Sequence, residues 1–74
     1  MTDTERQHLH LAGAHYRHPG AKETAIRKLG TSPAQHAQII LGLLERADAE
    51  AEEPVLVHRL RRVMEARRGG RVSA

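Results

Sequence analysis

The sequence predicts an all-α fold, a small four-helix domain that contains a helix-turn-helix. The chain has one aromatic residue, Tyr16, and no Phe or Trp. Its core must therefore come from aliphatic side chains with high helix propensity, which favour helices over sheets. Apolar residues also recur at intervals of three and four, the spacing of one helix face. We expect four helices, near residues 4–17, 21–29, 33–46 and 55–68.

The first helix is expected to begin after Thr2 or Asp3, because either side chain can cap a helix N-terminus. Its apolar stripe has the spacing i, i+3, i+4, i+7 and consists of Leu9, Ala12, Gly13 and Tyr16. Pro19 and Gly20 should end this helix or lie just past its end, since both residues interrupt helices.

The second and third helices are separated by a short turn with clear end signals. Gly30 suits a left-handed C-cap because it has no Cβ to clash there. Ser32 caps the next helix and Gln35 completes a capping box, with Pro33 in the first turn. The second helix should bury Ala25, Ile26 and Leu29. The third helix should leave Leu41 half exposed. The side chains that it should point inward are His36, Ile39, Ile40, Leu43 and Leu44.

The remaining chain divides into an acidic connector and a basic helix. Residues 45–53 carry a net charge of −4 and form either an extra helical turn or a loop. Pro54 suits the start of the last helix, and Gly69-Gly70 should stop it. We expect one helical domain at 1–70, with the helix-turn-helix at 21–46 and a disordered tail at 71–74. Its core should bring together Leu29, Ile40, Leu43 and Leu60.

The segment 21–46 indicates DNA binding, because a short helix, a glycine turn and a capped second helix are typical of a helix-turn-helix. In such motifs the second helix enters the major groove with its N-terminal residues toward the bases. Glutamine amides can bond base edges there, an alanine methyl can touch thymine, and cations can meet phosphates. The candidate DNA-binding residues are Lys22, Arg27, Lys28, Ser32, Ala34, Gln35, Gln38, Arg59, Arg61 and Arg62.

The composition argues against several other classes of protein. The chain has a net charge of +3 and no cysteine, which excludes disulfides, thiolate zinc sites and cysteine nucleophiles. No apolar run approaches the roughly 18 residues that a membrane span needs, and the N-terminus is unlike a signal peptide. No catalytic constellation or phosphate-binding loop is evident. We therefore expect a cytoplasmic protein that is not an enzyme, with no cofactor and no membrane partner.

Six histidines are unusual in a chain of 74 residues. His8, His15 and His18 fall near one face of the expected first helix, and two imidazoles one turn apart can bind zinc or nickel. Packing or surface roles are far more common for such residues, so we predict no metal site. His15 and His18 would instead titrate near neutral pH and could make the binding of a polyanion pH-dependent.

Two motifs resemble a family of small uncharacterised actinobacterial proteins with the patterns AGAKE-x-AI and LV-x-RLRR. They are Ala21-Lys22-Glu23 with Ala25-Ile26, and Leu56-Val57 with Arg59-Leu60-Arg61-Arg62. The resemblance covers about residues 14–62 and is equally compatible with a phage of such a host. It implies a helix-turn-helix and, by analogy, DNA binding. Members of the family carry aromatics where this chain has His15, Tyr16 and His18, and again where it has His36 and Ala37.

Two functions follow as hypotheses. The first is a small DNA-binding protein, a transcriptional regulator that binds double-stranded DNA through the helix-turn-helix, as a homodimer because one such domain makes a small interface. The alternative is a protein-interaction module that binds and modulates a host or cellular protein. The two basic regions favour the first hypothesis, and an exposed Leu41 favours the second.

Overall fold

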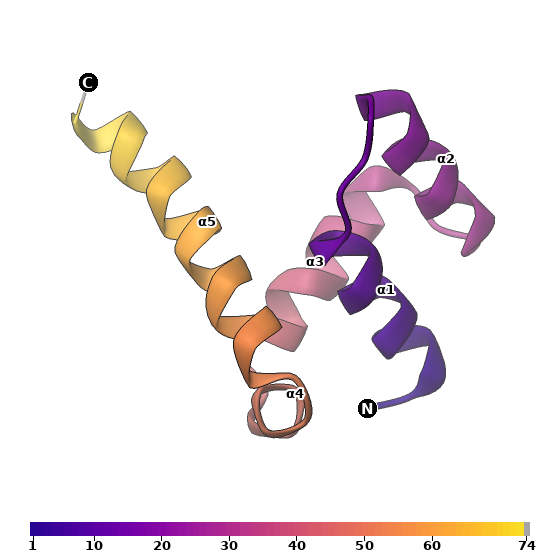
Figure 1. Ribbon diagram of the computed structural model, residues 1–74, viewed down its shortest axis with the longest axis horizontal. Helices are drawn as coiled ribbons and strands as arrows, with labels where there is room; N and C mark the ends of the chain where they lie inside the picture. The colour runs from indigo at the N-terminus through magenta and orange to yellow at the C-terminus, as the bar shows by residue number, and fades with distance from the viewer. Residues whose placement is uncertain (74) are drawn as a thin grey trace.

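The chain is helical throughout most of its length in this computed structural model, which describes residues 1–73 apart from the side chains of Pro19 and residues 67–73. No strand occurs within residues 1–73, so the predicted all-α class is confirmed. In Figure 1, α3 lies between α5 on one side and α1 with α2 on the other. The helices are α1 (Asp3–Gly13), α2 (Pro19–Lys28), α3 (Pro33–Leu44), α4 (Ala47–Glu52) and α5 (Pro54–Ser73).

The first helix is shorter than its apolar stripe suggested. Thr2, one of the two expected capping residues, caps α1, and it also forms a capping box with Glu5 that was not predicted. The helix ends at Gly13, so its predicted extension to residue 17 is wrong. The residue before a proline is disfavoured in a helix, and His18 is the extended N-cap of α2 instead, where its side chain accepts a hydrogen bond from the Ala21 N–H. Proline therefore begins the second helix and does not merely end the first.

The turn between α2 and α3 matches its sequence signals. Gly30 has φ of 81°, the left-handed conformation expected after a helix. The Ser32 hydroxyl accepts a hydrogen bond from the Gln35 N–H, and the Gln35 side chain accepts one from the Ser32 N–H, which completes the capping box. The Thr31 hydroxyl also donates to the Ile26 carbonyl at 3.0 Å. These bonds satisfy backbone groups that helix ends leave free.

The acidic connector is a short helix, α4, which was one of its two expected forms. The last helix begins at Pro54 as expected but runs through Gly69-Gly70 to Ser73, so the predicted stop is wrong. A helix-interior glycine costs only about 1 kcal/mol relative to alanine and need not end a helix. The expected tail at 71–74 thus begins inside α5, and Ala74 lies outside the described residues.

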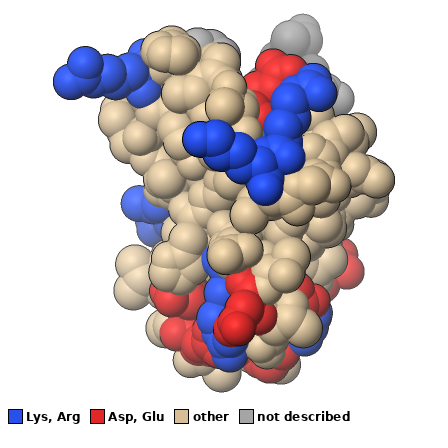
Figure 2. Space-filling view, turned by 90° about the vertical axis from the view of Figure 1, so that its right-hand side faces the viewer, with Lys and Arg blue, Asp and Glu red and all other residues tan. Residues whose placement is uncertain are grey.

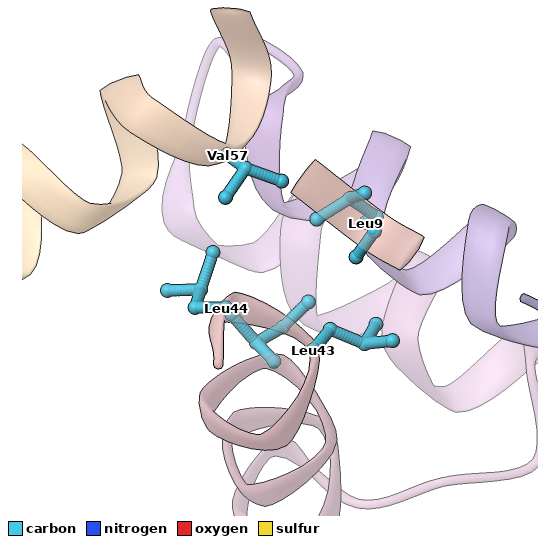
Figure 3. Packing of buried hydrophobic residues seen from close by; sticks show 6 residues of the cluster. Leu9, Leu43, Leu44 and Val57 are labelled. Atoms are coloured by element: carbon cyan, nitrogen blue, oxygen red, sulfur yellow. The ribbon is translucent and has the colours of Figure 1, made fainter. Parts of the chain in front are cut away.

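The core gathers side chains from α1, α3, α4 and α5, and Figure 3 shows four of them converging. Ile40 and Leu43 belong to this core, as predicted. Leu60 packs against it but is only partly buried. Leu29 is not a member, so that prediction is wrong. It is the C-cap of α2, with ψ near 0°, and no longer continues the helical face. The buried cluster consists of Leu9, Ile40, Leu43, Leu44, Ala49 and Val57.

Two glycines should respond in opposite ways to alanine. A Cβ at Gly13 would overlap Leu56 Cδ1, and the Gly13 carbonyl accepts a hydrogen bond from Arg59 at 2.6 Å. Gly13→Ala should therefore destabilise the fold by about 1–3 kcal/mol through overpacking. Gly42 has open space around the Cβ position, so Gly42→Ala should stabilise α3 by about 1 kcal/mol. Urea unfolding measures both, and equal effects would contradict the close approach of α1 to α5.

Candidate nucleic-acid interface

Three of the predicted phosphate-binding cations lie on α2. Lys28 is exposed at the end of the helix, while Arg27 is exposed but pairs with Glu23 at 2.8 Å. Lys22 is partly buried and lines clefts that reach α3. In Figure 2 the charged side chains in the upper part of the face shown are mostly cationic and lie among many uncharged ones, whereas acidic and basic side chains intermix at its lower end.

The start of α3 lies next to the turn that follows α2 and presents small and amide side chains. Ala34, Gln35 and Gln38 are all exposed. The Ser32 hydroxyl and the Gln35 side-chain oxygen are occupied by the capping box, but the Gln35 NH2 group is left over from it. Gln38 has no such local bond within the described part of the chain and is the amide best placed to reach a partner.

The α5 arginines are not gathered with the cations of α2. Arg61 donates from Nε to the Leu44 carbonyl at 2.8 Å and so binds the C-terminal end of α3. The 12 residues of α3 span about 18 Å along the helix axis. The end of α3 that binds Arg61 is therefore far from Ser32 at the other end. Arg59 bonds the Gly13 carbonyl, whereas Arg62 is exposed. Two of the three arginines therefore hold helices together, a role that their pattern in the sequence did not reveal.

The acidic residues around α4 are paired within the molecule. Arg6 donates to both carboxylate oxygens of Glu52, at 2.6 and 3.1 Å, and Arg46 bonds Asp48 and Glu5. Hydrogen bonds from Arg46 and from the N-terminal ammonium hold the pKa of Asp48 far below its ordinary value. Arginines thus neutralise part of the connector's charge, but Glu53 bonds only His10 among the described residues and Glu45 is exposed, so the connector remains acidic.

A buried histidine pair joins α1 to α3. The Nδ1 atoms of His8 and His36 are 2.8 Å apart and their ring centroids 5.0 Å apart. His8 is fully buried, and His36 is 5% exposed, which confirms its predicted inward orientation. Because α1 ends at Gly13, His15 and His18 do not continue its face, so the expected grouping with His8 is wrong. His8 lies three and four residues before Leu11 and Ala12. This spacing places all three side chains on one helix face and indicates that His8 points inward.

Three effects lower the pKa of His36. The largest is burial, which penalises the charged imidazolium, and the charges of His8 and Lys22 act in the same direction. The described residues contain no group of three or more His, Asp or Glu side chains arranged to hold a metal ion. The pair is therefore organised as a hydrogen bond between two imidazoles within the helix packing.

The fold and the surface define a small all-helical protein with a cationic α2, an exposed α3 start and an internally paired acidic end. A family model described as a protein of unknown function (DUF3263) matches residues 1–72, and the chain belongs to that family. No curated protein and no solved structure matches it. In the described part of the chain no helix is long and apolar enough to cross a membrane.

The stability of the fold should fall in mild acid because of His36. Above its ordinary pKa of 6.5 the imidazole is neutral in both the folded and the unfolded chain. Below that pH the unfolded chain takes up a proton that the folded chain resists, so the unfolded state gains free energy. Thermal melts should therefore show a melting temperature that decreases from pH 7.5 to 5.5.

A His36→Asn variant should lose part of this pH dependence, because the amide approximates the Nδ1 position but does not titrate in this range. His15→Asn, at an exposed position, is the control and should keep it. A melting temperature that rises on acidification in the parent protein would contradict the assignment.

Proposed function

We propose that this protein is a small, non-catalytic DNA-binding regulator in which α2, the Gly30 turn and α3 act as a helix-turn-helix. The observation that carries the proposal is the exposed start of α3 beside the cations of α2. A helix presented in this way can enter the major groove with its first turns toward the bases. Two of the acidic residues that would repel DNA, Asp48 and Glu52, are paired with Arg46 and Arg6.

The start of α3 supplies the elements of a modest base readout. Gln38 can bond an adenine edge through its amide, and the methyl groups of Ala34 and Ala37 can contact thymine. All three side chains are exposed. The positive dipole end of α3 also favours a phosphate, although Pro33 has no N–H and the Gln35 N–H is bonded to the Ser32 hydroxyl. With no Arg or Asn at these positions, sequence preference should be weak in a monomer, and two copies would raise it.

The phosphate contacts fall mainly on the cations that the fold leaves accessible. Lys28 and Arg62 are exposed, whereas Arg61 is occupied by the Leu44 carbonyl and Glu50. Each phosphate neutralised by a cation makes binding more sensitive to salt. Affinity should therefore depend steeply on ionic strength and weakly on sequence.

The Lys28→Ala/Arg62→Ala double variant should weaken binding to every duplex alike. The slope of log affinity against log salt should become shallower by about 0.9 for each lost phosphate contact. Electrophoretic titrations at several salt concentrations measure this slope, with Lys28→Arg/Arg62→Lys as the charge-preserving control. Gln38→Ala should change preference among sequences by about 1–3 kcal/mol with the slope intact. A double variant that binds as tightly as the parent would refute the proposal.

A protein-interaction module is the second candidate, and the exposure of Leu41 favours it. Leu41 is 38% exposed and lines a hollow between α3 and α5 of about 200 Å³, together with Leu44, Met64 and Glu65. The hollow is lined by the apolar Leu41, Leu44 and Met64 and by the charged Glu45, Arg61 and Glu65, and protein interfaces combine apolar and charged side chains in this way. A second copy of the chain is the simplest partner to test.

If Leu41 lies in such an interface, Leu41→Asp should abolish concentration-dependent association while the fold is retained. Sedimentation velocity measures the association and circular dichroism the helix content. Leu41→Met, which keeps an apolar side chain of similar size, is the matched control and should associate like the parent. Unchanged association in Leu41→Asp would remove Leu41 from the interface.

A further inference from the structure

We propose that the cleft enclosed by α1, α2, α3 and α5 binds a small apolar monocarboxylate of six or seven carbons, with its carboxylate at Lys22 and His36. This inference concerns a ligand site that adjoins the base-reading start of α3 and shares Ala37 with it. It does not rest on the proposed DNA binding.

The walls of the cleft are apolar and come from different helices. Ala12 of α1 and Ile40 of α3 face Leu60, Val63 and Met64 of α5 across a volume of about 150 Å³. An apolar cavity of about this size accommodates a molecule such as benzene. Val63 is 44% exposed even though it lines the cleft, so a ligand there would cover apolar surface that the fold leaves open.

The polar end of the cleft is formed by Lys22 and His36. The His36 side chain is buried, with 5% of its surface exposed, and its Nδ1 is already bonded to His8. Its other ring nitrogen, Nε2, has no hydrogen-bond partner among the described residues, and the His36 ring lines the cleft. The nearby carboxylate of Glu23 is bonded to Arg27 at 2.8 Å. The ammonium of Lys22 thus has no competing partner there.

The hydrogen bond between His8 and His36 determines whether His36 presents a donor or an acceptor to the cleft. Between two neutral imidazoles one Nδ1 must carry the proton and the other must accept it. His8 Nε2 is buried without a partner, and a buried donor without an acceptor is rarer than an unsatisfied acceptor. His8 Nδ1–H therefore donates to His36 Nδ1. The proton of His36 then lies on Nε2, so the cleft contains one N–H donor and one ammonium.

A donor and a cation at one end of an apolar cleft suit an anion with an apolar tail. A carboxylate can accept from both His36 Nε2–H and Lys22. A bare anion would leave the α5 wall uncovered, and an uncharged apolar molecule would bury Lys22 without compensation. The volume is below the roughly 300–1,000 Å³ of sites for drug-sized ligands. A free acid of the size of hexanoate or benzoate therefore fits better than a longer chain segment.

Hexanoate titrated into the ¹³C,¹⁵N-labelled full chain at pH 7.5 tests the site. We expect saturable shifts confined to the Met64 and Ala12 methyl groups and the His36 ring, together with a rise in the pKa of His36. Hexanol and hexylamine have the same tail without the negative charge and should bind at least tenfold more weakly. These comparisons use the parent protein, so they do not depend on whether a variant folds.

Variants then locate the carboxylate and the tail. Lys22→Met should weaken hexanoate binding at least fivefold, and Lys28→Met, on the same helix outside the cleft, is the matched control. Ala37→Leu, at an exposed position that lines the cleft, should fill it and abolish the shifts.

Four outcomes would overturn the inference. They are the absence of saturable shifts at millimolar hexanoate, equal binding of hexanol, undiminished binding to Ala37→Leu, and tighter binding of N-acetyl-leucine, which would indicate a peptide C-terminus instead. A failure of DNA binding would leave this result unaffected, because the titration contains no DNA.

Discussion

The packing of α1 against α3 is the contact on which the rest of the structure depends. The two helices run in opposite directions, so Glu5 near the start of α1 meets Arg46 just after α3, while His8 meets His36 nearer its start. Between these polar contacts Leu9 is buried with Ile40 and Leu43. A chain of this length buries little surface, and α4 and α5 complete the core only because this pair provides a surface for them.

Polar residues stabilise the arrangement at places where the aliphatic core is thin. Arg61 and Arg59 bond backbone carbonyls at the ends of α3 and α1, groups that a helix cannot satisfy itself. Arg6 and Arg46 bind the carboxylates around α4. Much of the charge in this basic chain is thus used internally, and the accessible remainder is concentrated at residues such as Lys28 and Arg62. A DNA partner would therefore be bound through these few exposed cations.

The buried histidine pair lies between the hydrophobic core and the proposed ligand cleft. His36 takes part in the α1–α3 contact through Nδ1 and lines a cleft beside Lys22 with the rest of its ring. A ligand in this cleft would touch α5 as well as α2, and α2 is the helix whose cations stand beside the exposed start of α3. The same few residues therefore lie between the hydrophobic core and both proposed binding surfaces.

Local interactions were readable from the sequence because they depend on neighbours in the chain. The Ser32 capping box, the left-handed Gly30 and the inward stripe of α3 all formed as predicted, and Thr2 caps α1 as one of the two expected residues. Local sequence also accounts for the end of α1, because Pro19 makes His18 the N-cap of α2, and for Leu29, which is the C-cap before Gly30. The tertiary structure alone decided that His8 pairs with His36 and that Arg59 and Arg61 bind backbone carbonyls. These contacts join residues 17 to 46 positions apart on different helices, and such distances have no signature in a helical period.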